Sequence, residues 1–259
     1  MLTGETLTRA GIDVVTLKPA ECDVSRGLDL PVDTVAVDYE GREHVPDERT
    51  LSRLAETKRV LVTTPVRADG FDPLGDDSLL AGLPSDVCRV LVAGHPAYLS
   101  EAERNRAVAP RFGHALESTP DAWVGTEGVE RLAMAAGGVQ YDLLSRTTES
   151  ELRGLRAAGF GGGIAVYAPT VLTDDEDAIL DAVGSYAARR GPVARALPED
   201  APTDATADGR AREVLSAAVR DYALVGGVED VRSQVEALRE AGADHVVAYP
   251  ARGIDDFLA

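Results

Sequence analysis

Hydrophobic residues occur mostly in short, nearly continuous runs rich in Val, separated by longer mixed stretches. Such runs predict strands that are buried on both faces, as in a parallel sheet. The runs that we interpret as strands are residues 12–17, 34–37, 59–64, 88–93, 122–125, 140–144, 164–171 and 245–249. A weaker candidate strand lies at 113–118. About eight strands in 259 residues predict a single α/β domain, a (β/α)8 TIM barrel, with a doubly wound open sheet as the alternative.

Helical patterns are clearest in the second half of the chain. Residues 148–158 begin with Thr148 three positions before Glu151, the spacing of a capping box. Residues 174–190 begin with carboxylates and end with arginines, as the helix dipole favours. Residues 228–241 place apolar side chains on one face and stop before a glycine. The tract 197–209, rich in Pro, Asp and Ala, predicts a mobile loop within one barrel domain over 1–259.

The composition indicates adaptation to salt. The chain has 44 acidic and 26 basic residues, a formal net charge of −18, and only two lysines, Lys18 and Lys58. In about 1 M salt the Debye length is about 3 Å, so clustered surface carboxylates barely repel one another. We interpret the chain as halophilic, with an ordinary acidic protein as the alternative. Because no basic stripe is present to meet phosphates, we expect no nucleic-acid partner.

Neither the cysteines nor the histidines show metal-ligand spacing. Cys22 and Cys88 form no CxxC pair, so we expect buried, reduced thiols and no metal site. No run approaches 18 apolar residues, and the N-terminal stretch lacks an apolar signal region. We therefore expect a cytoplasmic protein with no membrane partner.

Candidate catalytic residues follow the predicted strands, because functional groups of parallel barrels gather at the carboxyl ends of the strands. Asp38 follows the run 34–37, and His95 follows the run 88–93; both are candidates for acid–base roles. Lys18 follows the first run and is a candidate phosphate partner or Schiff-base lysine. The structural alternatives are a salt-bridged surface carboxylate for Asp38 and a loop histidine for His95.

A glycine-rich turn follows the predicted strand 122–125. Gly125, Thr126 and Gly128 precede a predicted helix, where backbone N–H groups can approach an anion such as phosphate. Arg131 would be a local counter-ion, whereas Glu127 adds opposing negative charge. The alternative is a plain turn between a strand and a helix.

Three blocks of the sequence carry a resemblance to a known superfamily: VGTEGVERLAMAAGGVQYDLL at 124–144, IAVYAPTVLTDDEDAILDAVGSYAARR at 164–190 and LVGGVEDVRSQVEALREAGADHVVAYP at 224–250. They resemble the luciferase-like superfamily of flavin- and deazaflavin-dependent oxidoreductases. They occur in the order found in that superfamily, which includes coenzyme F420-dependent methylenetetrahydromethanopterin reductases. Departures are Val129, Gly227 and Val228 at positions where the superfamily has Pro, Thr and Pro, and an N-terminal half shorter than usual.

The resemblance implies a luciferase-like barrel, shortened in its N-terminal half, that binds F420 or FMN. It implies a cofactor phosphate held by the backbone of Gly125, Thr126 and Gly128, with Arg131 beside them as the candidate counter-ion. It also implies hydride transfer between that cofactor and a small substrate, for which a pterin-linked one-carbon unit is one candidate. It also allows a homodimer, since luciferase-like barrels commonly pair. Two other hypotheses stay open: a non-catalytic barrel acting as a flavin-binding or regulatory protein, and an unrelated barrel lyase or isomerase using Lys18.

Overall fold

The computed structural model describes residues 5–66, 82–92, 108–125 and 138–258. Its strands join in one sheet in the order β6-β5-β4-β3-β2-β1-β9-β7-β8, and a further pairing of β6 with β7 closes eight of them into a barrel. All pairings whose register is defined are parallel. The strands are β1 Val14–Leu17, β2 Thr34–Val37, β3 Arg59–Pro65, β4 Cys88–Val92, β5 Trp123–Gly125, β6 Gln140–Leu143, β7 Ile164–Leu172, β8 Leu224–Gly226 and β9 His245–Pro250. The (β/α)8 prediction is confirmed.

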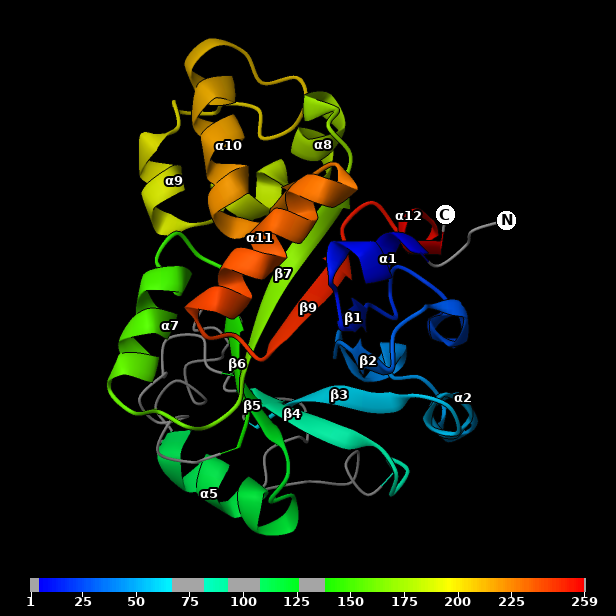
Figure 1. Ribbon diagram of the computed structural model, residues 1–259. Helices are drawn as coiled ribbons and strands as arrows, with labels where there is room; N and C mark the ends of the chain where they lie inside the picture. Colours follow the sequence, from blue (N-terminus) through cyan, green and yellow to red (C-terminus); the bar gives the residue numbers. More distant parts are fainter. Residues whose placement is uncertain (1–4, 67–81, 93–107, 126–137, 259) are drawn as a thin grey trace. The chain divides into compact units, whose positions relative to one another are not determined.

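Helices follow or precede most of these strands (Figure 1). They are α1 Glu5–Ala10, η1 Val24–Asp29, η2 Arg42–His44, α2 Glu48–Ala55, α5 Val108–Ser118, α7 Thr148–Ala157, α8 Glu176–Ala188, α9 Gly191–Ala196, α10 Gly209–Tyr222, α11 Val228–Ala241 and α12 Asp255–Leu258. None of the described helices is both long enough and apolar enough to span a bilayer.

Eight of the predicted strands are present within two residues at each end, and two predictions about strands are wrong. The stretch 113–118 belongs to α5, because Phe112 and Ala115, three residues apart, pack with Leu91 and Val124. The hydrophobic pattern also predicts no strand at β8, three residues that pair with β7 from Thr170 to Leu172.

The predicted capping box of α7 is wrong as well. The helix begins after Thr147, which makes no capping hydrogen bond with its side chain. The Thr148 hydroxyl instead accepts a hydrogen bond from the backbone N–H of Ser145, at 2.9 Å. Thr148 is almost fully buried, and its hydroxyl provides the hydrogen-bond partner that the Ser145 N–H needs in the turn before the helix.

The chain divides into two compact units, and each is described separately. The N-terminal unit holds Val14–Asp142 and Gly161–Ala165. In it, Leu51 and Leu54 are the buried residues of α2, which packs against η1 and β3.

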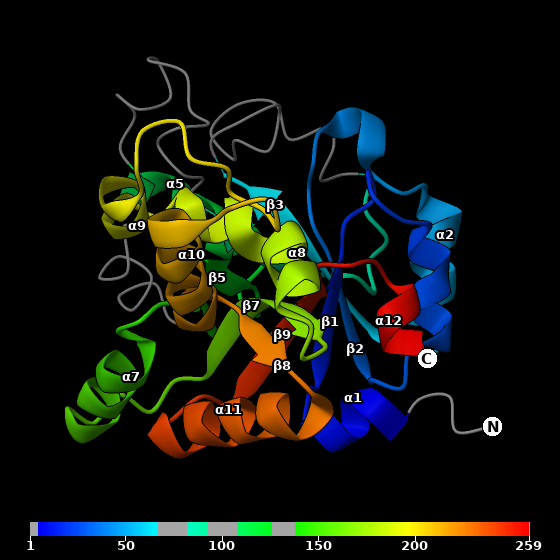
Figure 2. The ribbon, with the colours of Figure 1, turned by 90° about the horizontal axis from the view of Figure 1, so that it is seen from above.

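The C-terminal unit holds Met1–Asp13, Leu143–Phe160 and Val166–Ala259. Its largest apolar cluster joins α8 and α10 to Val171 and Val225. Helix α11 lies beside α1, as Figure 2 shows, and buries the predicted stripe that runs from Val231 to Ala241. It ends at Gly242, whose φ of 123° is a conformation that glycine adopts readily.

The tract 197–209 lies against α8 in this unit. The backbone N–H of Ala205 donates to Asp181 Oδ1 at 2.8 Å, and the hydroxyls of Ser185 and Thr203 are 2.8 Å apart. Gly184 packs directly on the Thr203 carbonyl. The mobility of this tract stays a prediction.

Candidate functional site

In the N-terminal unit, one face of the strands packs against helices. A Cβ added at Gly27 in η1 would lie 3.2 Å from Leu17 Cδ1, 3.2 Å from Leu54 Cδ2 and 3.4 Å from Val35 Cγ1. Leu17 of β1 and Val35 of β2 therefore point toward η1 and α2. Since side chains alternate along a strand, Thr16 and Ala36 point the other way. We call the face turned away from these helices the inner face.

Packing on α5 gives the same orientation for the neighbouring strands. Leu91 of β4 and Val124 of β5 belong to the apolar cluster that contains Phe112 of α5. Leu91 is aligned with Val124, and the preceding pair is Val90 with Trp123. By alternation, Val90 and Trp123 lie on the inner face.

Three polar side chains reach the inner face at the carboxyl ends of adjacent strands. Val37 is aligned with Leu17 on one side and with Val62 on the other. The residues that follow these three, Lys18, Asp38 and Thr63, continue the same alignment on the opposite face. The Asp38 N–H donates to the Leu17 carbonyl at 2.9 Å, so the ladder between β1 and β2 extends to this level. The fold thus brings Asp38 and Lys18 together, as neighbours across β1 and β2.

The loops after β1 and β2 are joined by hydrogen bonds that fix this arrangement. Glu40 Oε2 accepts from the Ala20 N–H at 2.8 Å, and Lys18 Nζ lies 3.5 Å from Glu21 Oε1. The Tyr39 N–H donates to Thr63 Oγ1 at 2.6 Å. We refer to Lys18, Glu21, Asp38, Glu40 and Thr63 as the Lys18–Asp38 site.

The surroundings of Asp38 bring the pKa of its carboxyl close to neutral pH. Burial raises the pKa of the Asp38 carboxyl from 3.8 to about 7. The Lys18 ammonium lowers that pKa, while the carboxylates of Glu40 and Glu21 raise it. A carboxyl with a pKa near the working pH can both donate and accept a proton, as general acid–base catalysis requires. The acid–base chemistry suggested for Asp38 by the sequence is therefore compatible with its surroundings.

A buried hydroxyl lies one layer below Lys18 on the inner face. Thr16, Ala36, Leu61 and Cys88 are aligned across β1 to β4. Thr16 is fully buried, and its Oγ1 has no hydrogen-bond partner within the described part of the chain. Sequence reasoning missed this residue: alternation along β1 puts Thr16 and Lys18 on one face, but only the tertiary structure shows that Thr16 is fully buried there.

Most of the other predicted site residues lie outside the described residues: His95, Thr126, Gly128 and Arg131. Gly125 is described, and it is buried at the end of β5. A Cβ at Gly125 would lie 2.9 Å from Val92 Cγ1 and 3.3 Å from Tyr141 Cδ1. The absence of a side chain at Gly125 therefore serves the packing of adjacent strands, and its role at a phosphate stays a prediction.

Cys22 and His245 both lie in surroundings that indicate structural roles. Burial raises the pKa of the Cys22 thiol and so disfavours the thiolate. The Cys22 Sγ lies 3.6 Å from the Lys18 carbonyl oxygen. His245 Nδ1 is 3.1 Å from Asp13, which also accepts from Arg239 at 2.7 Å. Among the residues that the structure describes, no three His, Cys, Asp or Glu side chains are grouped to hold a metal ion.

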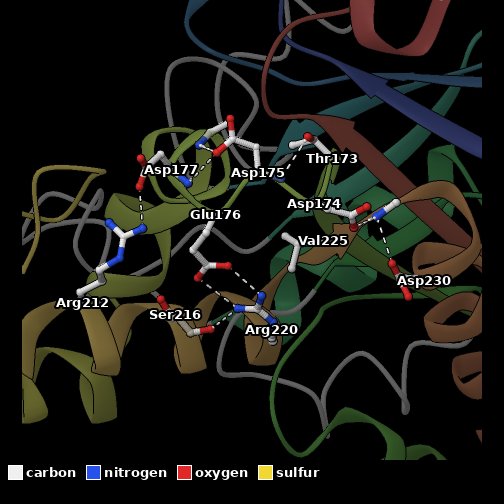
Figure 3. Close-up of polar contacts among 12 residues, drawn as sticks. Thr173, Asp174, Asp175, Glu176, Asp177, Arg212, Ser216, Arg220, Val225 and Asp230 are labelled. Carbon is white, nitrogen blue, oxygen red and sulfur yellow. Dashed lines mark hydrogen bonds and ion pairs between the residues drawn. The ribbon is translucent and has the colours of Figure 1, made fainter.

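The C-terminal unit has its own glycine pair at a helix start, and carboxylates occupy it (Figure 3). The Gly227 N–H, just before α11, donates to Asp174 Oδ1 at 2.7 Å and to Asp230 Oδ2 at 3.2 Å. The exposed N-terminus of a helix attracts anions. Here the two carboxylates already supply negative charge, so this turn is not suited to a phosphate.

Two ion pairs join α8, the helix that follows β7, to α10. Glu176 is 2.8 Å from Arg220, and Asp177 is 2.6 Å from Arg212 (Figure 3). The hydrogen bond from Arg220 is the main reason that the pKa of Glu176 lies below its usual value. Asp175 caps α8 by accepting from the Asp177 and Ala178 N–H groups. These acidic residues stabilise helix starts and helix packing.

Two solved structures resemble this architecture. An F420-dependent secondary alcohol dehydrogenase, solved with an F420–acetone adduct, has a TM-score of 0.57 and 13% identity, over 95% of this chain and 96% of that chain. The monooxygenase RslO1 from Streptomyces bottropensis has a TM-score of 0.49 and 16% identity, over 94% and 95% of the two chains. At 13% identity the similarity to the dehydrogenase concerns the fold alone, a (β/α)8 TIM barrel, as the sequence predicts.

At the level of sequence, no curated protein matches the chain. One family model does match, over residues 7–257, which is nearly the whole chain. The chain therefore belongs to DUF7388, a family of unknown function.

Proposed function

We propose that this protein is a luciferase-like oxidoreductase that transfers a hydride between F420 or a flavin and a small alcohol or carbonyl substrate. The observation that carries the proposal is the Asp38 carboxyl, with its pKa raised to about 7, beside Lys18 on the inner face. Oxidation of an alcohol releases a proton as well as a hydride, and reduction of a carbonyl consumes both. A carboxyl that is half ionised near neutral pH suits the proton part of either direction.

The residues of the Lys18–Asp38 site divide this work. Asp38 as a carboxylate accepts the hydroxyl proton of an alcohol, and as a carboxylic acid it donates a proton to a carbonyl oxygen. The Lys18 ammonium stabilises negative charge that develops on the same oxygen. Thr63 and Glu40 keep the two loops in place through the Tyr39 and Ala20 N–H groups.

The cofactor would supply the hydride chemistry, and the chain would position it and exclude water. The proton chemistry of Asp38 and Lys18 fits the reacting end of such a cofactor. We propose that its phosphate is held by the backbone at Thr126 and Gly128 with Arg131. The turn at Gly227 does not fit that role, because Asp174 and Asp230 already accept from its N–H. Two other proposals rest on the resemblance alone: a pterin-linked one-carbon unit as the substrate in place of an alcohol or carbonyl compound, and a homodimer.

The first test measures the binding of F420 and of FMN to the purified protein in molar KCl, with absorbance as the readout. Saturable binding of one of them, with reduction that depends on a small alcohol or carbonyl compound, supports the proposal. Binding without substrate-linked reduction across a panel of such compounds supports a non-catalytic flavin-binding or regulatory barrel instead. If neither cofactor binds saturably, the proposal is wrong.

The second test assigns the proton step. Asp38→Asn should lower kcat by about 10²–10⁴-fold, the usual contribution of a general acid or base, without weakening cofactor binding. Asp47→Asn is the matched control, because Asp47 caps α2 by accepting from Thr50 N–H at 2.7 Å and lies outside the site. Equal kcat values for the Asp38→Asn variant and the unchanged protein would exclude Asp38 from the proton step.

A further inference from the structure

The two lysines of this chain have different surroundings. Lys58 Nζ donates to the carbonyls of Leu30 and Val32, both at 2.7 Å, and so stabilises the turn that leads into β2. Lys18 lies instead at the carboxyl end of β1 on the inner face, with 25% of its side chain exposed. A small molecule in contact with Asp38 would therefore also reach the amine of Lys18.

We propose that Lys18 forms an imine with a small aldehyde or ketone, and that Asp38 moves the protons of this reaction. This inference does not rest on the proposed hydride transfer, since it uses Lys18 as a nucleophile and needs no redox cofactor. It would give the site a second type of chemistry, the activation of bonds next to a carbonyl carbon.

The reaction balances with these two residues and water alone. The Asp38 carboxylate takes a proton from the Lys18 ammonium, and the neutral amine attacks the carbonyl carbon to form a C–N bond. The carbonyl oxygen receives the proton from Asp38 and becomes a hydroxyl. Asp38 then takes a second proton from nitrogen and passes it to that hydroxyl, which leaves as water while the C=N bond forms. The products are a protonated imine on Lys18, one water and the Asp38 carboxylate.

The geometry suits each step. Lys18 and Asp38 follow residues aligned across β1 and β2, so their side chains leave the same face at the same level. Thr16 Oγ1, two residues before Lys18 on that face, is a buried hydroxyl with no hydrogen-bond partner among the described residues. The raised pKa of Asp38 allows this carboxyl to act in both directions near neutral pH.

The charges of the site indicate which carbonyl compounds it takes. Glu21 and Glu40 add two carboxylates next to Lys18 and Asp38. A substrate carboxylate or phosphate near them would be repelled, whereas a neutral molecule would not. The substrate class is therefore a neutral aldehyde or ketone.

Reductive trapping tests the imine directly. The protein in molar KCl is incubated with glycolaldehyde, dihydroxyacetone or pyruvate, reduced with borohydride, and mapped by peptide mass spectrometry. With only two lysines and the N-terminal amine in the chain, each adduct has an unambiguous position. We expect trapping at Lys18 by the neutral compounds to be about 10-fold or more faster than at Lys58, with pyruvate slower.

Matched variants separate a reactive site from mere accessibility. Lys18→Arg should abolish the rapid adduct, and Lys58→Arg should leave it unchanged. Asp38→Asn should slow trapping at Lys18 by about 10-fold or more, because the proton transfers lose their catalyst. Glu21→Gln should improve trapping of pyruvate relative to glycolaldehyde. Circular dichroism of each variant confirms that it is folded.

Two results would overturn the inference. One is labelling of Lys18 at the same rate as Lys58 and the N-terminal amine. The other is rapid labelling of Lys18 that a folded Asp38→Asn variant does not slow. A negative result here leaves F420 or FMN binding intact, so failure of the imine proposal and failure of the hydride-transfer proposal are distinguishable.

Discussion

Replacing Asp38 by Asn should stabilise the protein at neutral and higher pH. Asn has nearly the same shape as Asp but carries no charge. In the folded protein the pKa of Asp38 is raised from 3.8 to about 7, chiefly by burial, so the ionised form is the unfavourable one. The folded state therefore holds a proton between about pH 4 and 7 that the unfolded state has lost, and the free energy of unfolding falls as the pH rises through this window.

The size of the effect follows from the two pKa values. A difference between 3.8 and about 7 corresponds to about 4 kcal/mol, at about 1.4 kcal/mol for each pH unit. Asp38 as a whole residue is only half-buried, so we expect the Asp38→Asn variant to gain about 2–4 kcal/mol at pH 8. At pH 4, where Asp38 is protonated in the folded state, the two proteins should differ by less than about 1 kcal/mol.

Urea unfolding at several pH values, at constant high KCl, measures this difference. The quantity of interest is the free energy of unfolding of Asp38→Asn minus that of the unchanged protein, since other groups titrate equally in both. Asp47→Asn is the control: hydrogen bonds from Thr50 lower the pKa of Asp47, so its replacement should give no gain at pH 8. A difference for Asp38→Asn that is flat from pH 4 to 8 would refute the argument for a raised pKa, and with it the acid–base role.

Three further stability predictions concern the C-terminal unit, and thermal or urea unfolding measures all of them. Gly184→Ala should destabilise by about 1–3 kcal/mol, because the new Cβ would collide with the Thr203 carbonyl oxygen. In α7, a Cβ added at Gly154 would meet no atom within 4 Å, so Gly154→Ala should stabilise by up to about 1 kcal/mol through helix propensity. Equal changes in stability for Gly184→Ala and Gly154→Ala would contradict the close packing at Gly184. Arg156→Ala should lower the free energy of unfolding by about 1–3 kcal/mol, because the Arg156 guanidinium donates to the Gly242 carbonyl at 2.7 Å and to Asp244 at 2.6 Å. An unchanged free energy of unfolding would show that solvent replaces these hydrogen bonds.

The errors in predicting elements have a common physical origin. Strands such as β2 and β7 were located from their continuous apolar runs, because burial on both faces leaves a local signature. Strand β8 has only three residues, and its pairing with β7 rather than its composition makes it a strand. The stretch 113–118 is helical because Phe112 and Ala115 pack against strands that are distant in sequence.

The sequence by itself determined the parallel barrel and the placement of Lys18 and Asp38 after consecutive strands, since both follow from local patterns. The tertiary structure decided that these two side chains share the inner face and that burial raises the pKa of Asp38 to about 7. It also decided that Asp174, 53 residues before Gly227, occupies the glycine turn of α11. Register, burial and long-range hydrogen bonds depend on which segments meet in space, and no local pattern along the chain encodes that.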